Sequence, residues 1–119
     1  MAIERINNLR QQFEQLNIDG ILISRPENRT YLSGFKGSDG WLIVSEKSAC
    51  IAVDSRYTIQ AKKEAPEFEV IHIKGELQSW LPDIVSGLGI TKLGFEASDI
   101  SFASFQKLRD SLAEGKCKA

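Results

Sequence analysis

The first apolar stripe of the chain recurs at the spacing of a helix, with intervals of three and four residues. Its members are Ile3, Ile6, Leu9, Phe13 and Leu16. This spacing places them on one side of an α-helix, which we expect to end near Asn17. The following Asp19-Gly20 predicts a turn into the short apolar run of residues 21–23, which is typical of an interior strand.

Strands and helices are expected to alternate along the rest of the chain. Pro26 suits the first turn of a short helix through Leu32, and Pro82 predicts either a kink or the start of the main part of a later helix. The expected strands cover residues 41–44, 50–53, 68–73 and 93–96, and the later helices cover residues 57–64, 77–88 and 102–112. This alternation, with one hairpin near the middle, predicts a three-layer α/β/α domain with a mixed sheet of about five strands.

A glycine-punctuated segment lies before the expected hairpin. Gly34, Gly37 and Gly40 are three residues apart, where a chain can turn sharply or approach another backbone. For the glycines themselves, a turn with positive backbone angles is the simpler interpretation. Residues 54–55 follow the second strand of the hairpin, where the N-cap of the next helix is expected. Arg56 therefore lies at the carboxyl end of a strand, a usual place for ligand-facing residues in α/β sheets.

The same segment carries a resemblance to a known family. The stretch YLSGFKGSDGWLIV (residues 31–44), followed by AVDSRYTIQA (residues 52–61), is similar to the amino-terminal domain of the creatinase/prolidase/aminopeptidase P family. The resemblance covers nearly the whole chain and rests on the order of several segments. At positions 29 and 30 the family usually has an apolar residue and then a bulky or basic one, whereas this chain has Arg29 and Thr30. No contact is therefore carried over at these two positions.

Size and composition fit one domain with one core. The chain has 119 residues, of which 42% are hydrophobic. The net charge of −1 at pH 7, with acidic and basic residues interspersed, gives no general attraction to nucleic acid or to an anionic membrane. No apolar run approaches the roughly 20 residues that span a bilayer. Cys50 and Cys117 are expected to be free thiols in a reducing cytosol.

The sequence predicts neither a catalytic residue nor a metal ligand in this chain. A dinuclear metallopeptidase brings several carboxylates and at least one histidine to two metals about 3.5–4 Å apart, and the resemblance places those ligands in another domain. The single histidine, His72, shares a strand face with Phe68 and Val70, so we expect it to be a packed or hydrogen-bonded interior residue. A nuclease of ribonuclease-H-like fold would carry carboxylates on its first strand, and residues 20–24 contain none.

Three residues are candidate substrate contacts, which could serve the active site of a partner subunit. In creatinase-like relatives an arginine of this domain helps to line the partner's substrate site, and the resemblance gives that role to Arg56. Its planar guanidinium suits bidentate recognition of a carboxylate. The alternative role of Arg56 is a salt bridge to Asp54 that anchors the hairpin. Phe35 and Trp41 are expected to be exposed aromatic anchors for substrate or for a neighbouring subunit.

The resemblance implies a ribonuclease-H-like arrangement and a place in a larger enzyme. Residues 1–119 would form the non-catalytic amino-terminal domain of a cytoplasmic Xaa-Pro aminopeptidase or dipeptidase, with the catalytic domain downstream. That domain would bind two divalent metals, such as Mn, Co or Zn, and the proline-containing peptide. The amino-terminal domain would itself hold no cofactor. It would cap the active site and support a homodimer. The alternatives are the corresponding domain of a creatinase-type amidinohydrolase and a peptidase-like, protein-binding domain without catalysis.

Overall fold

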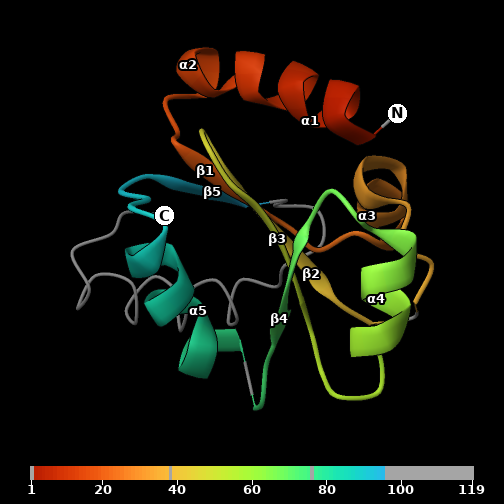
Figure 1. Ribbon diagram of the computed structural model, residues 1–119. Helices are drawn as coiled ribbons and strands as arrows, with labels where there is room; N and C mark the ends of the chain where they lie inside the picture. Colours follow the sequence, from red (N-terminus) through yellow and green to blue (C-terminus); the bar gives the residue numbers. More distant parts are fainter. Residues whose placement is uncertain (1, 38, 76, 96–119) are drawn as a thin grey trace.

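Five strands form one mixed sheet in the computed structural model, which describes residues 2–37, 39–75 and 77–95 (Figure 1). The strands are β1 (Gly20–Ile23), β2 (Trp41–Ser45), β3 (Ala49–Val53), β4 (Glu69–His72) and β5 (Leu93–Phe95). Their order across the sheet is β4-β3-β2-β1-β5. β2 lies between β1 and β3 and runs antiparallel to both. β5 runs parallel to β1, and β4 runs parallel to β3. The expected α/β fold with a five-stranded mixed sheet is confirmed.

Helices cover both faces of this sheet (Figure 1). They are α1 (Ala2–Gln11), α2 (Phe13–Leu16), α3 (Pro26–Ser33), α4 (Thr58–Glu64) and α5 (Leu77–Gly87). The first four lie on one face and α5 lies on the other. Pro82 lies inside α5 and does not start it. Among the described residues, no helix has the length and apolar character needed to cross a membrane. The helix expected at residues 102–112 lies outside the described residues.

Alternating side chains of the central strands build two separate cores. From β2, Leu42 and Val44 join the core beneath α1 to α4, whereas Ile43 joins the core beneath α5. From β3, Ile51 and Ala52 divide between the two cores in the same way. Successive side chains of a strand point to opposite faces, so a continuous apolar run makes both faces apolar. This is why the sheet requires helices on both sides.

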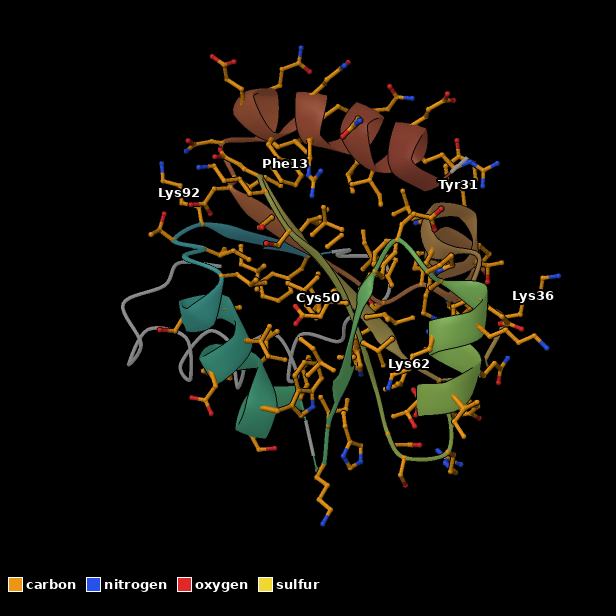
Figure 2. All side chains as sticks on the ribbon, viewed as in Figure 1. Phe13, Tyr31, Lys36, Cys50, Lys62 and Lys92 are labelled. Atoms are coloured by element: carbon orange, nitrogen blue, oxygen red, sulfur yellow. The ribbon has the colours of Figure 1, made fainter. Side chains whose placement is uncertain are left out.

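The amino-terminal stripe forms two helices, although a single one was expected. The backbone N–H of Gln12 donates to the carbonyl of Leu9, only three residues back, so the chain tightens there and α1 ends. Phe13 is buried and points from α2 toward the sheet, whereas Leu16 is 55% exposed (Figure 2). Asn17 adopts a left-handed conformation and ends α2. The expected end of the helical segment near Asn17 is confirmed.

The start of α4 also differs from the expectation. Asp54 and Ser55 were predicted to cap this helix, but its N-cap residue is Tyr57, which makes no side-chain capping bond. The Asp54 carboxylate instead accepts a hydrogen bond from the backbone N–H of Arg56 at 2.9 Å. An aspartate that bonds to the backbone two residues ahead stabilises a turn. Asp54 therefore shapes the exit from β3 rather than the helix end.

Candidate functional site

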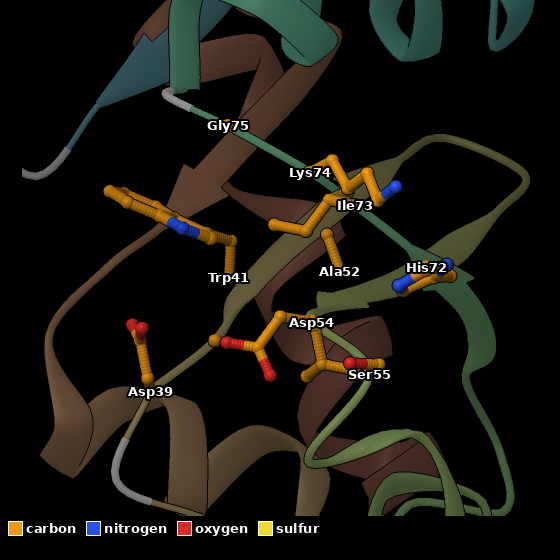
Figure 3. A pocket seen from close by; sticks show the side chains of 11 residues that line it. Asp39, Trp41, Ala52, Asp54, Ser55, His72, Ile73, Lys74 and Gly75 are labelled. Atoms are coloured by element: carbon orange, nitrogen blue, oxygen red, sulfur yellow. The ribbon is translucent and has the colours of Figure 1, made fainter.

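A hollow of about 520 Å³ opens where β3 and β4 finish and β2 begins (Figure 3). These three segments meet because β3 runs antiparallel to β2 and parallel to β4: Trp41 lies opposite Ala52, and Val53 lies opposite His72. The N–H of Ile73 donates to the carbonyl of Val53 at 2.9 Å and continues this pairing past the end of β4. The carboxyl ends of parallel strands are a frequent place for ligands in α/β sheets.

The walls of the hollow combine an aromatic ring with charges of both signs. Trp41 is partly buried and packs edge-on against Trp80, with ring centroids 6.3 Å apart. In the view of Figure 3, Asp39 and Asp54 lie below Trp41, and Lys74 lies across from them at the upper side. Such a site suits a molecule with an apolar part and charged groups. In the described part of the chain, no group of three or more metal-ligating side chains is present.

Arg56 stands beside this hollow and is held by Asp54. Its Nη2 lies 2.7 Å from Oδ2 of Asp54, and its Nε lies 3.1 Å from Oδ1. These hydrogen bonds lower the pKa of the Asp54 carboxyl and raise the pKa of Arg56. The guanidinium also lies over the ring of Tyr57, at 5.1 Å from its centroid. The salt bridge expected as the alternative role is therefore present, and the substrate contact stays a prediction.

The Arg56 side chain nevertheless remains open to other groups. It is 67% exposed, whereas its partner Asp54 is 35% exposed. The electrostatic influence of Asp39, a lining residue of the hollow, also contributes to raising the pKa of Arg56. The pair thus presents a pre-oriented and largely exposed guanidinium next to the hollow.

The two aromatic candidates occupy different environments. Phe35 was expected to be exposed, and that expectation is wrong: its side chain is 0% exposed and packs edge-on against Tyr57, with centroids 6.0 Å apart. The cause is Gly34, whose left-handed conformation ends α3 and sends the chain into the core. Trp41 is partly exposed at the hollow, so its contact with a substrate stays a prediction.

His72 is exposed, in contrast to the expected interior position. It is the last residue of β4, and β4 is an edge strand of the sheet. Phe68 and Val70 contribute to the core beneath α1 to α4, whereas His72, the final residue of β4, does not. His72 lines the hollow.

Arg29 has a structural role that was not predicted from the sequence. Its side chain is 3% exposed, and its two Nη atoms donate to backbone carbonyls: Nη1 to Gly40 and Nη2 to Gly37, both at 2.9 Å. The signal was available in the spacing, because Arg29, Leu32 and Ser33 form the buried side of α3 at positions i, i+3 and i+4. A charged residue on the inner face of a helix indicates a polar partner inside the fold.

A family model described as the Creatinase/Prolidase N-terminal domain matches residues 5–119 of the chain. Among curated proteins, the chain is 39% identical over 105 residues to the Uncharacterized peptidase YqhT of Bacillus subtilis (strain 168), a match that covers 88% of this chain and 29% of the relative. The chain spans less than a third of the length of the first curated relatives it matches.

Two solved structures extend the likeness to three dimensions. An Xaa-Pro dipeptidase from Bacillus anthracis aligns with a TM-score of 0.92 at 32% identity, over 99% of this chain and 32% of that one. The N-terminal domain of the cytoplasmic peptidase PepQ from Mycobacterium tuberculosis H37Rv aligns with a TM-score of 0.87 at 32% identity, over 97% of this chain and 89% of that one. The fold therefore matches both an amino-terminal domain solved alone and part of a longer enzyme.

Proposed function

Because this chain belongs to the creatinase/prolidase N-terminal domain family, we propose that it is the non-catalytic amino-terminal domain of an Xaa-Pro peptidase. Its hydrolytic centre, with two divalent metals such as Mn, Co or Zn, would lie in a catalytic domain of the same parent protein. We also propose that the helices and strands of this domain have a three-layer, ribonuclease-H-like arrangement. Whether the parent cleaves dipeptides or longer peptides is decided by assay on Ala-Pro and on Ala-Pro-Ala.

The observation that carries the proposal is the exposed, pre-oriented guanidinium of Arg56 beside the hollow. Asp54 holds it by hydrogen bonds to Nη2 and Nε, so little side-chain freedom is left to lose when a ligand binds. A guanidinium recognises a peptide carboxylate by two parallel hydrogen bonds, and the Trp41 ring in the hollow offers apolar contact area. Arg56 and Trp41 would therefore contact the peptide substrate. The buried Phe35 is withdrawn from this role.

Capping of the active site and association into a homodimer are part of the same proposal. Ile59 follows Arg56 by three residues and is 83% exposed, which offers an apolar contact next to the charged one. The surface carrying Arg56 and Ile59 would face the catalytic domain, in the same or in the partner subunit. A cytoplasmic location is supported by the name of the PepQ relative.

Substitution Arg56→Lys in the full-length parent tests the proposal. Lysine keeps the charge but lacks the planar fork, so kcat/KM for Ala-Pro or Ala-Pro-Ala should fall about tenfold or more. The melting temperature should stay unchanged, because Arg56 is an exposed residue in a surface ion pair. The matched control is Arg25→Lys, an exposed arginine with its own acidic neighbour, Glu27 at 3.4 Å, which should alter neither quantity.

Two results would contradict the proposal. Unchanged kinetics together with a lowered melting temperature would make Arg56 an anchor of the hairpin and end its assignment to the substrate site. A parent that light scattering finds strictly monomeric while fully active would end the dimer assignment.

A further inference from the structure

A short glycine loop (residues 34–37, 39 and 40) leads from α3 into the hollow. The loop delivers Asp39 to the rim and Trp41, the first residue of β2, to the wall. The guanidinium of Arg29 reaches its far end, where it donates to the carbonyls of Gly37 and Gly40. These two carbonyls flank the segment that carries Asp39. The position of the rim is therefore tied to one side chain of the preceding helix.

The chemistry of Arg29 suits this contact better than that of any other residue. Gly37 and Gly40 are buried, so their carbonyls need partners from the protein. A guanidinium presents several N–H donors in a fixed plane and can serve two carbonyls at once. An ammonium group carries all its donors on one nitrogen atom and would serve the two separate carbonyls less well. Burial of the Arg29 charge is unfavourable by itself and is offset only where such bonds form.

The near end of the glycine loop is anchored by four further hydrogen bonds. Ser33 Oγ donates to the carbonyl of Arg29 at 2.6 Å and accepts from the N–H of Phe35 at 3.0 Å. Thr30 Oγ1 donates to the carbonyl of Phe35 at 3.1 Å. The N–H of Lys36 donates to Oε1 of Glu64 on α4 at 2.8 Å, a bond that lowers the pKa of Glu64. Both ends of the loop are thus fixed within the domain itself.

Close packing beneath the loop adds to this fixation. A Cβ atom placed on Gly37 would lie 2.1 Å from Cζ of the buried Phe35 ring. The Phe35 ring is held in turn against Tyr57, the residue that follows Arg56. Contacts therefore run without a gap from Arg29 through the Phe35 ring to Tyr57, and the Arg56 guanidinium lies over the Tyr57 ring.

We propose that Arg29 is a positioning residue that fixes the rim of the hollow before any ligand binds. It acts through the carbonyls of Gly37 and Gly40 and thereby sets the positions of Asp39 and Trp41. The consequence for a peptide rests on the proposed function, whereas the fixation of the loop does not. A rim positioned in advance reduces the conformational entropy lost on binding. Loss of the contact should accordingly weaken binding of the substrate more than it slows the chemical step.

Hydrogen exchange on the 119-residue chain tests the fixation directly, first without a substitution. In nuclear magnetic resonance spectra of the unmodified chain, the Hη protons of Arg29 should exchange with water at least about tenfold more slowly than those of exposed Arg25. Arg29→Lys should then speed exchange of the Asp39 and Gly40 amides, at the end of the loop that Arg29 holds, about tenfold or more, and by a clearly larger factor than that of the Leu22 amide in β1. Arg25→Lys is the matched control and should alter none of these rates. Equal Hη exchange of the two arginines, or loop amides unaffected by Arg29→Lys, would overturn the proposal.

Kinetics of the full-length parent then separate this proposal from the proposed function. Arg29→Lys should raise KM for the Xaa-Pro peptide about fivefold or more with kcat changed less than about twofold, because under the proposed function the metal ligands would lie in another domain. If Arg56→Lys has no kinetic effect, the proposed function fails, and the exchange rates alone decide the role of Arg29. If Arg56→Lys impairs the enzyme but Arg29→Lys leaves KM unchanged despite faster loop exchange, Arg29 is not a positioning residue for the site.

Discussion

At each end of the β2–β3 hairpin, one arginine donates hydrogen bonds to two backbone carbonyls, but the two arginines differ in burial. At the turn end, Arg10 of α1 donates from Nε to the carbonyl of Ser45 at 2.8 Å and from Nη2 to the carbonyl of Ser48 at 3.0 Å. At the hollow end, Arg29 of α3 donates to two glycine carbonyls at 2.9 Å. The bond lengths are alike, but Arg10 is partly exposed and Arg29 is 3% exposed.

This difference in burial decides what each arginine contributes. If Arg10 is lost, water can still hydrate the carbonyl of the partly exposed Ser48, which also keeps its hydrogen bond from the Ser45 N–H. If Arg29 is lost, the carbonyls of Gly37 and Gly40 stay inside the fold, where an unpaired polar group is strongly unfavourable. Equal hydrogen-bond geometry therefore does not imply equal stabilisation.

Substitution of each arginine by methionine should lower the free energy of unfolding by different amounts at the two ends of the hairpin. Methionine keeps an unbranched stem of similar length but has no N–H donors. Arg29→Met should lower the free energy of unfolding by about 2–4 kcal/mol, and Arg10→Met by about 1 kcal/mol or less. Urea denaturation of the two variants, followed by circular dichroism, measures both changes. Equal losses would show that burial does not distinguish the two ends of the hairpin.

Gly37→Ala should disturb the hollow end without removing a hydrogen bond. The added methyl group would meet the buried Phe35 ring at 2.1 Å, so the ring or the loop must shift. The expected loss is about 1–3 kcal/mol in the free energy of unfolding, measured by urea denaturation. Gly87→Ala, at the end of α5, is the matched control: no atom lies within 4 Å of its added Cβ, so the change should be neutral or slightly stabilising. A neutral Gly37→Ala would show that the loop is loosely packed.

The smallest expected effect on stability concerns Asp19, an acidic residue at an exposed contact. This contact joins the start of β1 to the start of β5. The Asp19 carboxylate accepts hydrogen bonds from the backbone N–H of Lys92 at 2.8 Å and from the N–H and hydroxyl of Thr91. Burial alone would raise the pKa of Asp19, but these donors lower it below its ordinary value of 3.8. A carboxyl with a lowered folded-state pKa stabilises the fold above its unfolded pKa and loses that contribution as the pH falls through the folded value.

Thermal unfolding of the Asp19→Asn variant between pH 2 and pH 7 measures this contribution. The chain with Asp19 should be slightly more stable than the variant above about pH 5, and the difference should shrink as the pH falls below about 4. A difference that stays constant across this range would mean that ionisation of Asp19 does not contribute to stability.

The sequence predicted the elements of the fold because each has a local cause. Apolar runs at residues 21–23, 41–44 and 50–53 indicated the three central strands, and Pro26 marked the start of α3. Errors arose where a tertiary or short-range contact outweighed the pattern. The tight turn at Gln12 divides the first helix, and the Asp54 carboxylate pairs with Arg56 instead of capping α4. No periodicity in the sequence reports such contacts.

The candidate site was only partly accessible to sequence reasoning. Trp41 lines the hollow and Arg56 stands beside it, and their places near the ends of strands could be predicted from the strand boundaries. The burial of Phe35 could not be inferred, because it depends on the left-handed turn at Gly34 and on the space beside Tyr57. The burial of Arg29 could be inferred from its spacing with Leu32 and Ser33, but its partners could not, because they are carbonyl oxygens, which every residue carries.

The pairing of β1 with β5 has a consequence for how the sheet assembles. The hairpin of β2 and β3 closes over the short turn at residues 46–48, whereas Asp19 and Thr91 meet across 72 positions of the chain. Loop-closure entropy rises with the length of the segment enclosed, so the parallel edge begins with a larger entropic disadvantage than the hairpin. On a ribosome, moreover, β1 to β3 are complete before β5 has been synthesised. The antiparallel centre can thus form on its own, and β5 extends a sheet that already exists.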